Sequence, residues 1–320
     1  MNRRLDDLRI LTGTAHPTLA RDIAGHLGVE VGQMVVGRFS DGEIFTKIEE
    51  SLRGMDVFVV QPTSSPVNEH IMELLIINDA LRRASARRIT CVMPYFGYAR
   101  QDKKIKPREP VTARLVADMI TLSGANRVLA VDLHADQIQG FFNIPVDHLY
   151  GGPLIADYLI ERGVYDRDVV VVSPDLGGVG RAHALAGQLD AGIAIIAKRR
   201  PEPNVSEIIT VIGEVKGRTC VMIDDMIDTG GSIAQGAEAL KRMGAERIFA
   251  CCSHGVFSGE ALRRLDAAPI EEVIITDTIC LPEEKRIPKV KVLSVAPLLA
   301  EAIERIHRDA SVSELFLPYL

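Results

Sequence analysis

The sequence predicts an α/β protein built from two copies of one unit, each a mainly parallel sheet flanked by helices. Short apolar runs rich in β-branched residues alternate with longer segments of helical period, as in βα units around a parallel sheet. The chain also repeats itself, because residues 80–89 read ALRRASARRI and residues 239–248 read ALKRMGAERI. A chain of 320 residues is long for a single core, so two domains are expected.

The expected strands are short apolar runs, at residues 9–12, 33–39, 56–61, 89–93, 127–132, 168–173, 193–197, 208–213, 218–223, 247–252, 272–276 and 289–293. The expected helices carry amphipathic patterns, at residues 69–83, 112–122, 153–162, 181–189, 232–243 and 297–307. Both copies of the repeat follow a strand, a polar loop and a helix, which favours duplication over chance. The turn-rich Tyr150-Gly151-Gly152 lies between the copies and predicts domains at 1–150 and 151–320.

Composition limits the classes of function. A net charge of −6 argues against a general nucleic-acid binder, because such domains usually carry a basic excess. No apolar run reaches the ~18–20 residues that span a bilayer, and the first residues lack the apolar segment of a signal peptide. We therefore expect a cytoplasmic protein without nucleic-acid or membrane partners. The cysteines show no metal-ligand spacing, and four lie in strand-like runs as small apolar residues: Cys91, Cys220, Cys251 and Cys252.

The strongest functional signal is the segment 221–232, VMIDDMIDTGGS. A buried strand is expected to end in Asp224 and Asp225, followed by a Gly-rich turn and a helix. Proteins of α/β class bind ligands at the carboxyl edge of the sheet, where glycines and helical N–H groups can meet an anion. The two acids suit sugar hydroxyls or a metal ion. An N-cap before an ordinary helix would not explain them.

Positive charge gathers in two further segments. Residues 95–104 (YFGYARQDKK) follow a strand and lead on to Lys106 and Arg108, whereas residues 198–205 (KRRPEPNV) enter a polar, Pro-bearing loop. Solvated surface loops are the alternative in both cases. Because the protein as a whole is acidic, an anionic ligand has to be met by such a local basic cluster or by backbone dipoles. Past two further strand ends lie His134 and Asp175, the latter before Gly177 and Gly178.

The segment 221–232 resembles the ribose 5-phosphate loop of phosphoribosyltransferases and of ribose-phosphate pyrophosphokinases. Three segments resemble the pyrophosphokinases specifically: 95–104 their ATP-binding stretch, 132–142 (DLHADQIQGFF) their metal and nucleotide segment, and 38–43 (RFSDGE) their adenine loop. The resemblance runs from Thr12 to the tail 311–316, SVSELF. The sequence is identified as a member of the class I ribose-phosphate pyrophosphokinases, which implies a phosphoribosyltransferase-like fold for both domains.

The resemblance implies transfer of the β,γ-diphosphoryl group of MgATP to the C1 hydroxyl of ribose 5-phosphate, giving phosphoribosyl pyrophosphate and AMP. The implied ATP ligands are Phe39, Asp41, Glu43, Arg100, Gln101 and Asp102. The implied ribose 5-phosphate ligands are Asp224, Asp225, Asp228, Thr229, Gly230, Gly231 and Ser232. Lys198 and Arg200 are implied to stabilise the transferring group from a catalytic loop, and His134 and Asp175 to bind Mg²⁺. No residue stands out as a general base.

The resemblance also implies a homo-oligomer, a hexamer, with the C-terminal tail at a subunit interface and the Phe39 loop contacting adenine bound to a neighbouring chain. Phosphate as activator and ADP as inhibitor are the implied effectors. The matching positions are Ser51, Arg53, Ser85, Ser311, Ser313 and Phe316. Pro107 and Glu109 depart from several relatives, which have serine and a small neutral residue there. Since proline lacks an N–H donor and glutamate adds a negative charge, we expect weaker activation by phosphate.

Three other functions use similar sequences. A phosphoribosyltransferase would need the segment 221–232 but not the two ATP-type segments. A non-catalytic regulatory subunit would be expected to lose the catalytic loop, whereas Lys198 and Arg200 are both present. A ligand-sensing repressor would need a DNA-binding module, and no part of the two predicted domains is left over for one.

Overall fold

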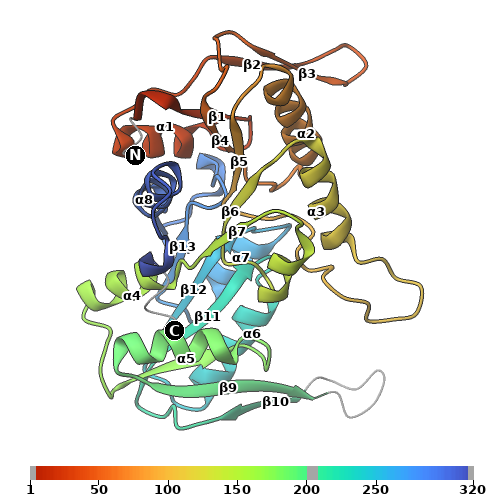
Figure 1. The fold of residues 1–320 in the computed structure, drawn as a ribbon. Helices are drawn as coiled ribbons and strands as arrows, with labels where there is room; N and C mark the ends of the chain where they lie inside the picture. The colour runs from red at the N-terminus through yellow and green to blue at the C-terminus, as the bar shows by residue number, and fades with distance from the viewer. Residues whose placement is uncertain (1–4, 200–207, 316–320) are drawn as a thin grey trace. The chain divides into compact units, whose positions relative to one another are not determined.

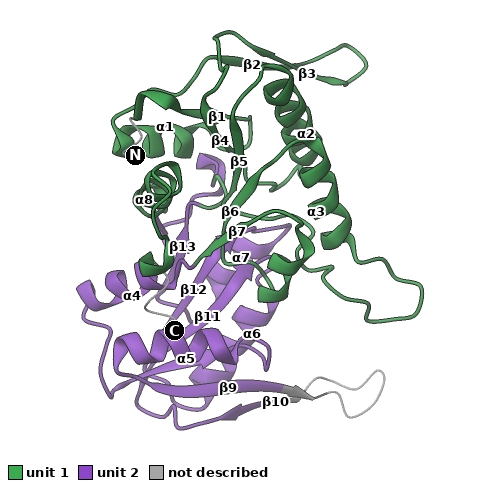
Figure 2. Cartoon of the chain, in the orientation of Figure 1, with its two compact units in different colours: residues 1–149, 278–280, 295–317 green, residues 150–277, 281–294, 318–320 purple. Residues whose placement is uncertain are grey.

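The computed structural model describes residues 5–199 and 208–315, which form two compact units (Figures 1 and 2). Unit 1 comprises described residues 5–149, 278–280 and 295–315, and unit 2 comprises 150–199, 208–277 and 281–294. The predicted α/β class is confirmed, since each unit has a largely parallel sheet covered by helices. None of the described helices is both long and apolar enough to cross a membrane.

Within its described part, unit 1 has a five-stranded parallel sheet of order β1-β4-β5-β6-β7. These strands are β1 (Leu8–Thr12), β4 (Asp56–Val60), β5 (Arg88–Met93), β6 (Arg127–Val131) and β7 (Val146–Leu149). Helices α2 (Val67–Arg83) and α3 (Thr112–Ser123) bury their apolar sides on one face in a single core. Helices α1 (Pro17–Leu27) and α8 (Ala296–His307) lie together on the other face (Figure 1).

The predicted strand at 33–39 forms, but outside the parallel sheet. It is β2 (Met34–Arg38), and it pairs antiparallel with β3 (Ile44–Ile48), which the sequence analysis missed. Also missed were β7, α1 and the short helix α7 (Ala261–Ala267). The remaining short elements are 3₁₀ turns, at Leu5–Asp7, Asp136–Phe141, Glu283–Lys285 and Ser313–Leu315.

Helix α8 belongs to unit 1, although the predicted domain 151–320 placed it with the second copy. Leu299, Ile303 and Ile306 are buried, and the helix packs against α1. At its carboxyl end the Nδ1 atom of His307 lies 2.8 Å from an Asp56 carboxylate oxygen, and both side chains are fully buried. The position of α8 at the end of the sequence suggested that it belongs to the second domain. The helix instead packs in unit 1, because its apolar side is buried there.

Unit 2 has, among its described residues, a seven-stranded sheet of order β10-β9-β8-β11-β12-β13-β14 in which only β10 is antiparallel. The strands are β8 (Val169–Ser173), β9 (Gly192–Arg199), β10 (Ile208–Ile212), β11 (Thr219–Ile227), β12 (Arg247–Gly255), β13 (Glu272–Thr276) and β14 (Val290–Leu293). Helices α4 (Gly152–Glu161) and α5 (Val179–Leu189) cover one face. Helices α6 (Gly231–Arg242) and α7 cover the other. The four cysteines expected in strands are buried.

The sequence repeat corresponds to one structural unit in both halves. The first copy joins α2 to β5 and the second joins α6 to β12. The connecting turns also match in detail: the N–H of Arg87 donates to Met55 O and that of Glu246 to Arg218 O, both at 2.9 Å. Equivalent backbone bonds at equivalent places are what a duplicated βαβ unit requires.

Candidate active site

The carboxyl ends of β8 and β11 form the topological switch point of unit 2. Strand β8 leads through α5 to β9 on one side, and β11 leads through α6 to β12 on the other. Because the two connections diverge, this is the position at which open α/β sheets bind ligands, in the crevice outside the strand ends. Two predicted segments meet there: the loop containing Asp175 and the turn from Asp228 to Gly231.

Strand β11 is longer than predicted, so Asp224 and Asp225 lie within it and not after it. Its pairing with β8 stops at Met222, whereas its pairing with β12 continues to Ile227. The two acids therefore extend beyond the last β8 partner, along the edge of the crevice.

The two acids interact with each other and with one cation. The N–H of Asp225 donates to Asp224 Oδ1 at 2.9 Å. Arg181, in the first turn of α5, places Nη1 3.5 Å from Asp224 Oδ1 and 3.9 Å from Asp225 Oδ1. Burial and then the charge of Asp225 raise the pKa of Asp224 to about 7, against the opposing effect of Arg181. Near neutral pH the pair can both accept and donate hydrogen bonds, as sugar hydroxyls require.

Replacement of Asp224 by asparagine is expected to stabilise the fold in alkaline solution. The folded-state pKa lies above the ordinary value of 3.8, so the unfolded chain ionises first and this carboxyl disfavours folding as pH rises from about 4 through 7. The melting temperature of the Asn variant should exceed that of wild type by a few °C at pH 8 and by little at pH 4. Asp157→Asn, at an exposed position of α4, is the control. An equal loss at both pH values would contradict the assignment.

The turn after β11 combines close packing with an open front. Gly230 has φ of 71°, and a Cβ there would lie 3.1 Å from Ala261 O of α7. A Cβ on Gly231 would instead have no neighbour nearer than 3.9 Å. Thr229 and Ser232 are exposed beside it. Since the first N–H groups of a helix have no acceptor within the helix, the start of α6 faces open space with donors available to an anion.

The loop after β8 is built tightly around Asp175. Its Oδ1 accepts from the N–H of Gly178 at 2.9 Å, and the Ser173 hydroxyl donates to Asp175 O at 2.6 Å. A Cβ on Gly178 would lie 2.9 Å from Ser173 Oγ, so the loop requires glycine there. The Asp175 side chain remains exposed at the crevice.

Lys198 lies within β9 and not in a loop, because pairing with β10 extends the strand beyond the predicted 193–197. Its backbone pairs with Ile209. Arg200 falls outside the described residues, and so does the rest of the predicted catalytic loop up to residue 207.

The predicted adenine loop is the tip of the β2–β3 hairpin in unit 1. The N–H of Phe39 donates to Glu43 O at 2.8 Å, and Gly42 turns the chain with φ of 96°. Asp41 Oδ1 accepts from the N–H of Glu43 at 3.1 Å. Phe39 is 57% exposed and contacts the Phe45 ring, with centroids 5.0 Å apart. The hairpin thus presents an aromatic face to solvent.

The structure brings two other predicted segments of unit 1 together. Asp102 is buried, and its Oδ2 accepts from Gln137 Nε2 at 2.8 Å. Gln137 follows exposed His134 in the loop after β6, so the ATP-type stretch and the segment 132–142 are joined. Arg100 and Gln101 are exposed next to this contact.

Comparison with known proteins decides what these segments belong to. The model of the N-terminal domain of ribose phosphate pyrophosphokinase matches residues 8–124, and that of the phosphoribosyl synthetase-associated domain matches 198–317. The ribose-phosphate pyrophosphokinase of Clostridium perfringens is 57% identical over 99% of both chains, and that of Caldanaerobacter subterraneus is 58% identical over 99% of this chain and 100% of its own. The chain belongs to the ribose-phosphate pyrophosphokinase family.

A solved structure agrees with this assignment. Phosphoribosylpyrophosphate synthetase from Mycobacterium smegmatis superposes with a TM-score of 0.90 at 46% identity, covering 95% of this chain and 99% of that one. The predicted fold and reaction are therefore confirmed: this pyrophosphokinase transfers the diphosphoryl group of ATP to ribose 5-phosphate. The phosphoribosyltransferase and regulatory-subunit alternatives are not favoured by relatives of this identity.

The residues expected to hold Mg²⁺ are Asp175 and His134, and they can be compared with the ligands that this ion prefers. Among the described residues no group of three or more His, Cys, Asp and Glu side chains could hold a metal. Mg²⁺ commonly binds through one or two carboxylates, waters and substrate phosphates, and exposed Asp175 fits that pattern. His134 is the poorer fit, because the ion prefers oxygen donors.

The predicted regulatory positions lie in two places within unit 1. Ser51 and Arg53 are exposed on a turn whose Gly54 N–H donates to Ser85 O at 2.9 Å, so these three positions lie together. Ser311 and exposed Ser313 follow α8, where Arg305 donates to Ser311 O at 3.0 Å. Phe316 is outside the described residues.

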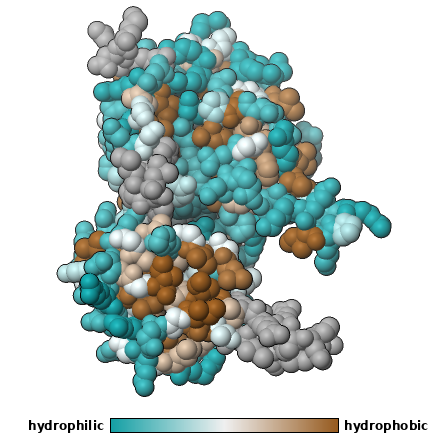
Figure 3. All heavy atoms as spheres, turned by 60° about the horizontal axis from the view of Figure 1, so that its bottom comes forward, coloured by the Kyte–Doolittle hydropathy of each residue, from teal (hydrophilic) through white to brown (hydrophobic). Residues whose placement is uncertain are grey.

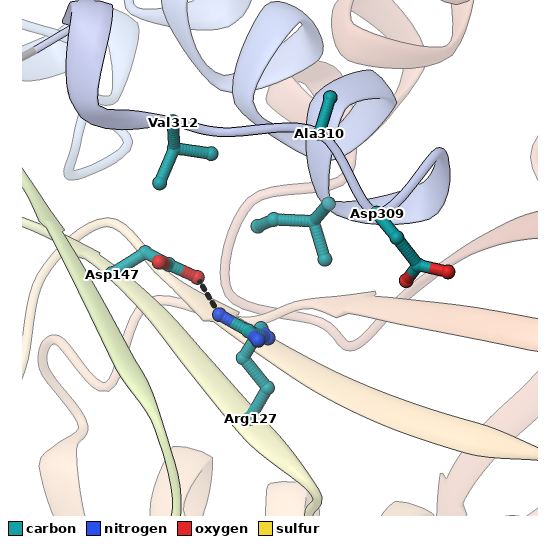
Figure 4. Close-up of a pocket in the computed structure, with 6 residues that line it drawn as sticks. Arg127, Asp147, Asp309, Ala310 and Val312 are labelled. Carbon is teal, nitrogen blue, oxygen red and sulfur yellow. Dashed lines mark hydrogen bonds and ion pairs between the residues drawn. The ribbon is translucent and has the colours of Figure 1, made fainter.

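One pocket of unit 1 lies beside the tail that carries Ser311 and Ser313, since Val312 lines it. It has a volume of about 200 Å³ and lies between the start of β6 and β7 and the chain after α8 (Figure 4). Arg127 and Asp147 form an ion pair of 2.6 Å on its wall, opposite Asp309 and Val312. Because it opens at the amino ends of the strands, it is on the edge that α/β proteins do not use for ligands.

Sequence reasoning missed three residues that hold the candidate site. Arg181 begins the expected helix 181–189, directly after the segment with Asp175 and Gly178. Its position three residues after Gly178 could have suggested that it faces Asp224 and Asp225. Gln137 lies in the segment 132–142, but nothing in that segment indicated its contact with Asp102. Arg264, on the unpredicted helix α7, donates to Thr229 O at 2.9 Å, a contact between segments far apart in the sequence.

Proposed function

We propose that the crevice at the ends of β8 and β11 binds ribose 5-phosphate. The observation that carries this proposal is the order of elements on one strand end: two interacting acids, a tight turn and an open helix start at Gly231. The turn from Asp228 to Ser232 would hold the phosphate through N–H and hydroxyl donors. Asp224 and Asp225 would hold ribose hydroxyls.

ATP would be held by Arg100, Gln101 and Asp102, with the exposed ring of Phe39 stacking on an adenine and Asp41 and Glu43 beside it. The C1 hydroxyl attacks the β-phosphorus, the bond between the β-phosphorus and the oxygen bridging to the α-phosphate breaks so that AMP leaves, and the hydroxyl proton passes to solvent water. Lys198 and Arg200 neutralise charge on the transferring group, and the residues that would hold Mg²⁺ are Asp175 and His134. The ion, when bound, offsets negative charge on phosphate oxygens.

Formation of AMP that depends on ribose 5-phosphate tests the reaction. Purified protein with ATP and Mg²⁺ should release AMP only when the sugar phosphate is added, in equal amount to phosphoribosyl pyrophosphate. Unphosphorylated ribose is the control, since it lacks the group that the α6 turn would bind. Release of ADP in place of AMP, or no turnover with either sugar, would overturn the proposal.

We also propose a homo-oligomer, a hexamer, responsive to phosphate and ADP. Figure 3 shows apolar side chains gathered on unit 2. Ile193 and Ile212, on neighbouring strands β9 and β10, point to the same side of the sheet and are 37% and 56% exposed. Contiguous apolar surface of this kind favours contact with another chain. Light scattering would measure the assembly, and titration of activity with phosphate would measure the effect of Pro107.

A further inference from the structure

We propose that Arg264 of helix α7 binds the 5-phosphate of ribose 5-phosphate. The proposal rests on the sugar-phosphate site described above and adds to it a side chain from outside the segment 221–232. Four observations support it: the packing of α7, the direction of the guanidinium group, the local charge and the contrast with Arg263.

The chain that follows β12 packs directly against the turn between β11 and α6. The N–H of Phe257 donates to Ile227 O at 3.1 Å, and that of Ser258 donates to Asp228 O at 2.9 Å. Helix α7 follows at once, and Gly230 packs so closely on Ala261 that a Cβ would meet its carbonyl oxygen at 3.1 Å. The position of α7 relative to the turn is therefore fixed by backbone contacts.

Arg264 faces the open front of this turn. Its Nη1 donates to Thr229 O at 2.9 Å and would lie 3.9 Å from a Cβ placed on Gly231. The side chain is exposed, and no carboxylate of the described residues forms an ion pair with it. A guanidinium group carries five N–H donors, and Thr229 O occupies only one of them. The others are available to an anion in the space before Gly231.

The charge of the site calls for such a cation. Asp224, Asp225 and Asp228 lie within this strand end and turn, and a phosphate monoester carries −1.5 to −2 charge near pH 7. A helix N-terminus contributes the equivalent of only about half a positive charge. Arg181 lies beside Asp224 and Asp225, which leaves Arg264 to supply a full positive charge at the Gly231 end.

The neighbouring Arg263 shows the contrast. Its Nε lies 2.5 Å from Oε2 of Glu260, the residue that precedes α7, and its side chain is 75% exposed. This ion pair lowers the pKa of Glu260, mainly through the hydrogen bond from Arg263. Arg263 is therefore paired with the residue at the start of α7, and its replacement by glutamine removes the same charge as replacement of Arg264 without changing a contact with the turn.

Kinetics of Arg264→Gln, Arg264→Lys and Arg263→Gln test the proposal. Loss of a charge-assisted bond should raise KM for ribose 5-phosphate about ten- to hundredfold in Arg264→Gln, with KM for ATP unchanged. Lysine keeps the charge and should recover much of the loss. Arg263→Gln should behave as wild type. Because Arg264 is exposed, melting curves should stay close to wild type in all three variants.

Two outcomes would overturn the proposal. If Arg264→Gln matched wild type while Arg264→Ala were impaired, a hydrogen bond to Thr229 O would suffice and Arg264 would only position the turn. If Arg264→Gln and Arg264→Ala both left KM for ribose 5-phosphate unchanged, Arg264 would have no role in binding it. Gly231→Val separates these outcomes from failure of the site itself, because it should abolish sugar-phosphate binding whether or not Arg264 contributes.

Discussion

Removing the Lys198 ammonium group is expected to lower kcat by ~10²–10³-fold, the typical effect of losing one preorganised charge-stabilising donor. Loss of Arg200, which lies outside the described residues, should have a similar or larger effect, since arginines that neutralise a transferring phosphoryl group contribute ~10³–10⁵-fold. Both effects should fall on kcat because charge develops in the transition state. Affinity for ribose 5-phosphate should change little.

Lys198→Ala, Arg200→Ala and a control, Lys216→Ala, would be compared in steady-state assays. Lys216 is exposed after β10 in the same unit, and its replacement by alanine removes the same positive charge. The Lys198 backbone is held in the β9–β10 ladder, so the variant should keep its fold and its melting temperature. Rates near wild type for both catalytic variants would remove this segment from the mechanism.

The parallel sheets were predictable because their strands are buried on both faces and read as apolar runs. β4 and β8, for example, are buried at every position. The hairpin partner β3 was not predictable, since its residues, Ile-Phe-Thr-Lys-Ile, form neither a continuous apolar run nor a strict apolar–polar alternation. Helix α1 was missed because its N-cap is His16, in place of the usual Ser, Thr, Asn or Asp, although Pro17 at the first helical position is itself a start signal.

The candidate site was predictable where the chemistry lies within one continuous segment. The acids and glycines of 221–232 could be recognised because strand, turn and helix follow one another. Arg181, Gln137 and Arg264 reach the site or its neighbours through tertiary contacts, which a linear pattern does not encode. Helix α8 shows the same limit at the level of domains, because its buried pairing with Asp56 joins positions 251 residues apart.

Gly231→Val is expected to eliminate binding of ribose 5-phosphate. The position has ordinary helical backbone and open space in front, so the protein accommodates a side chain there. The isopropyl group would occupy the place where phosphate must approach the N–H groups of α6. Losing two or more charge-assisted hydrogen bonds corresponds to a weakening of ~10²–10⁴-fold. Gly187→Val, at an open position of α5, introduces the same side chain elsewhere in unit 2.

Calorimetric titration of ribose 5-phosphate into wild type, Gly231→Val and Gly187→Val measures this directly. If ribose 5-phosphate binds at the end of β11, wild type and Gly187→Val should bind it with equal affinity. Gly231→Val should show no binding heat at the same concentrations. Melting curves should be alike for the three proteins. Wild-type affinity in the Gly231→Val protein would show that ribose 5-phosphate binds somewhere other than the crevice between β8 and β11.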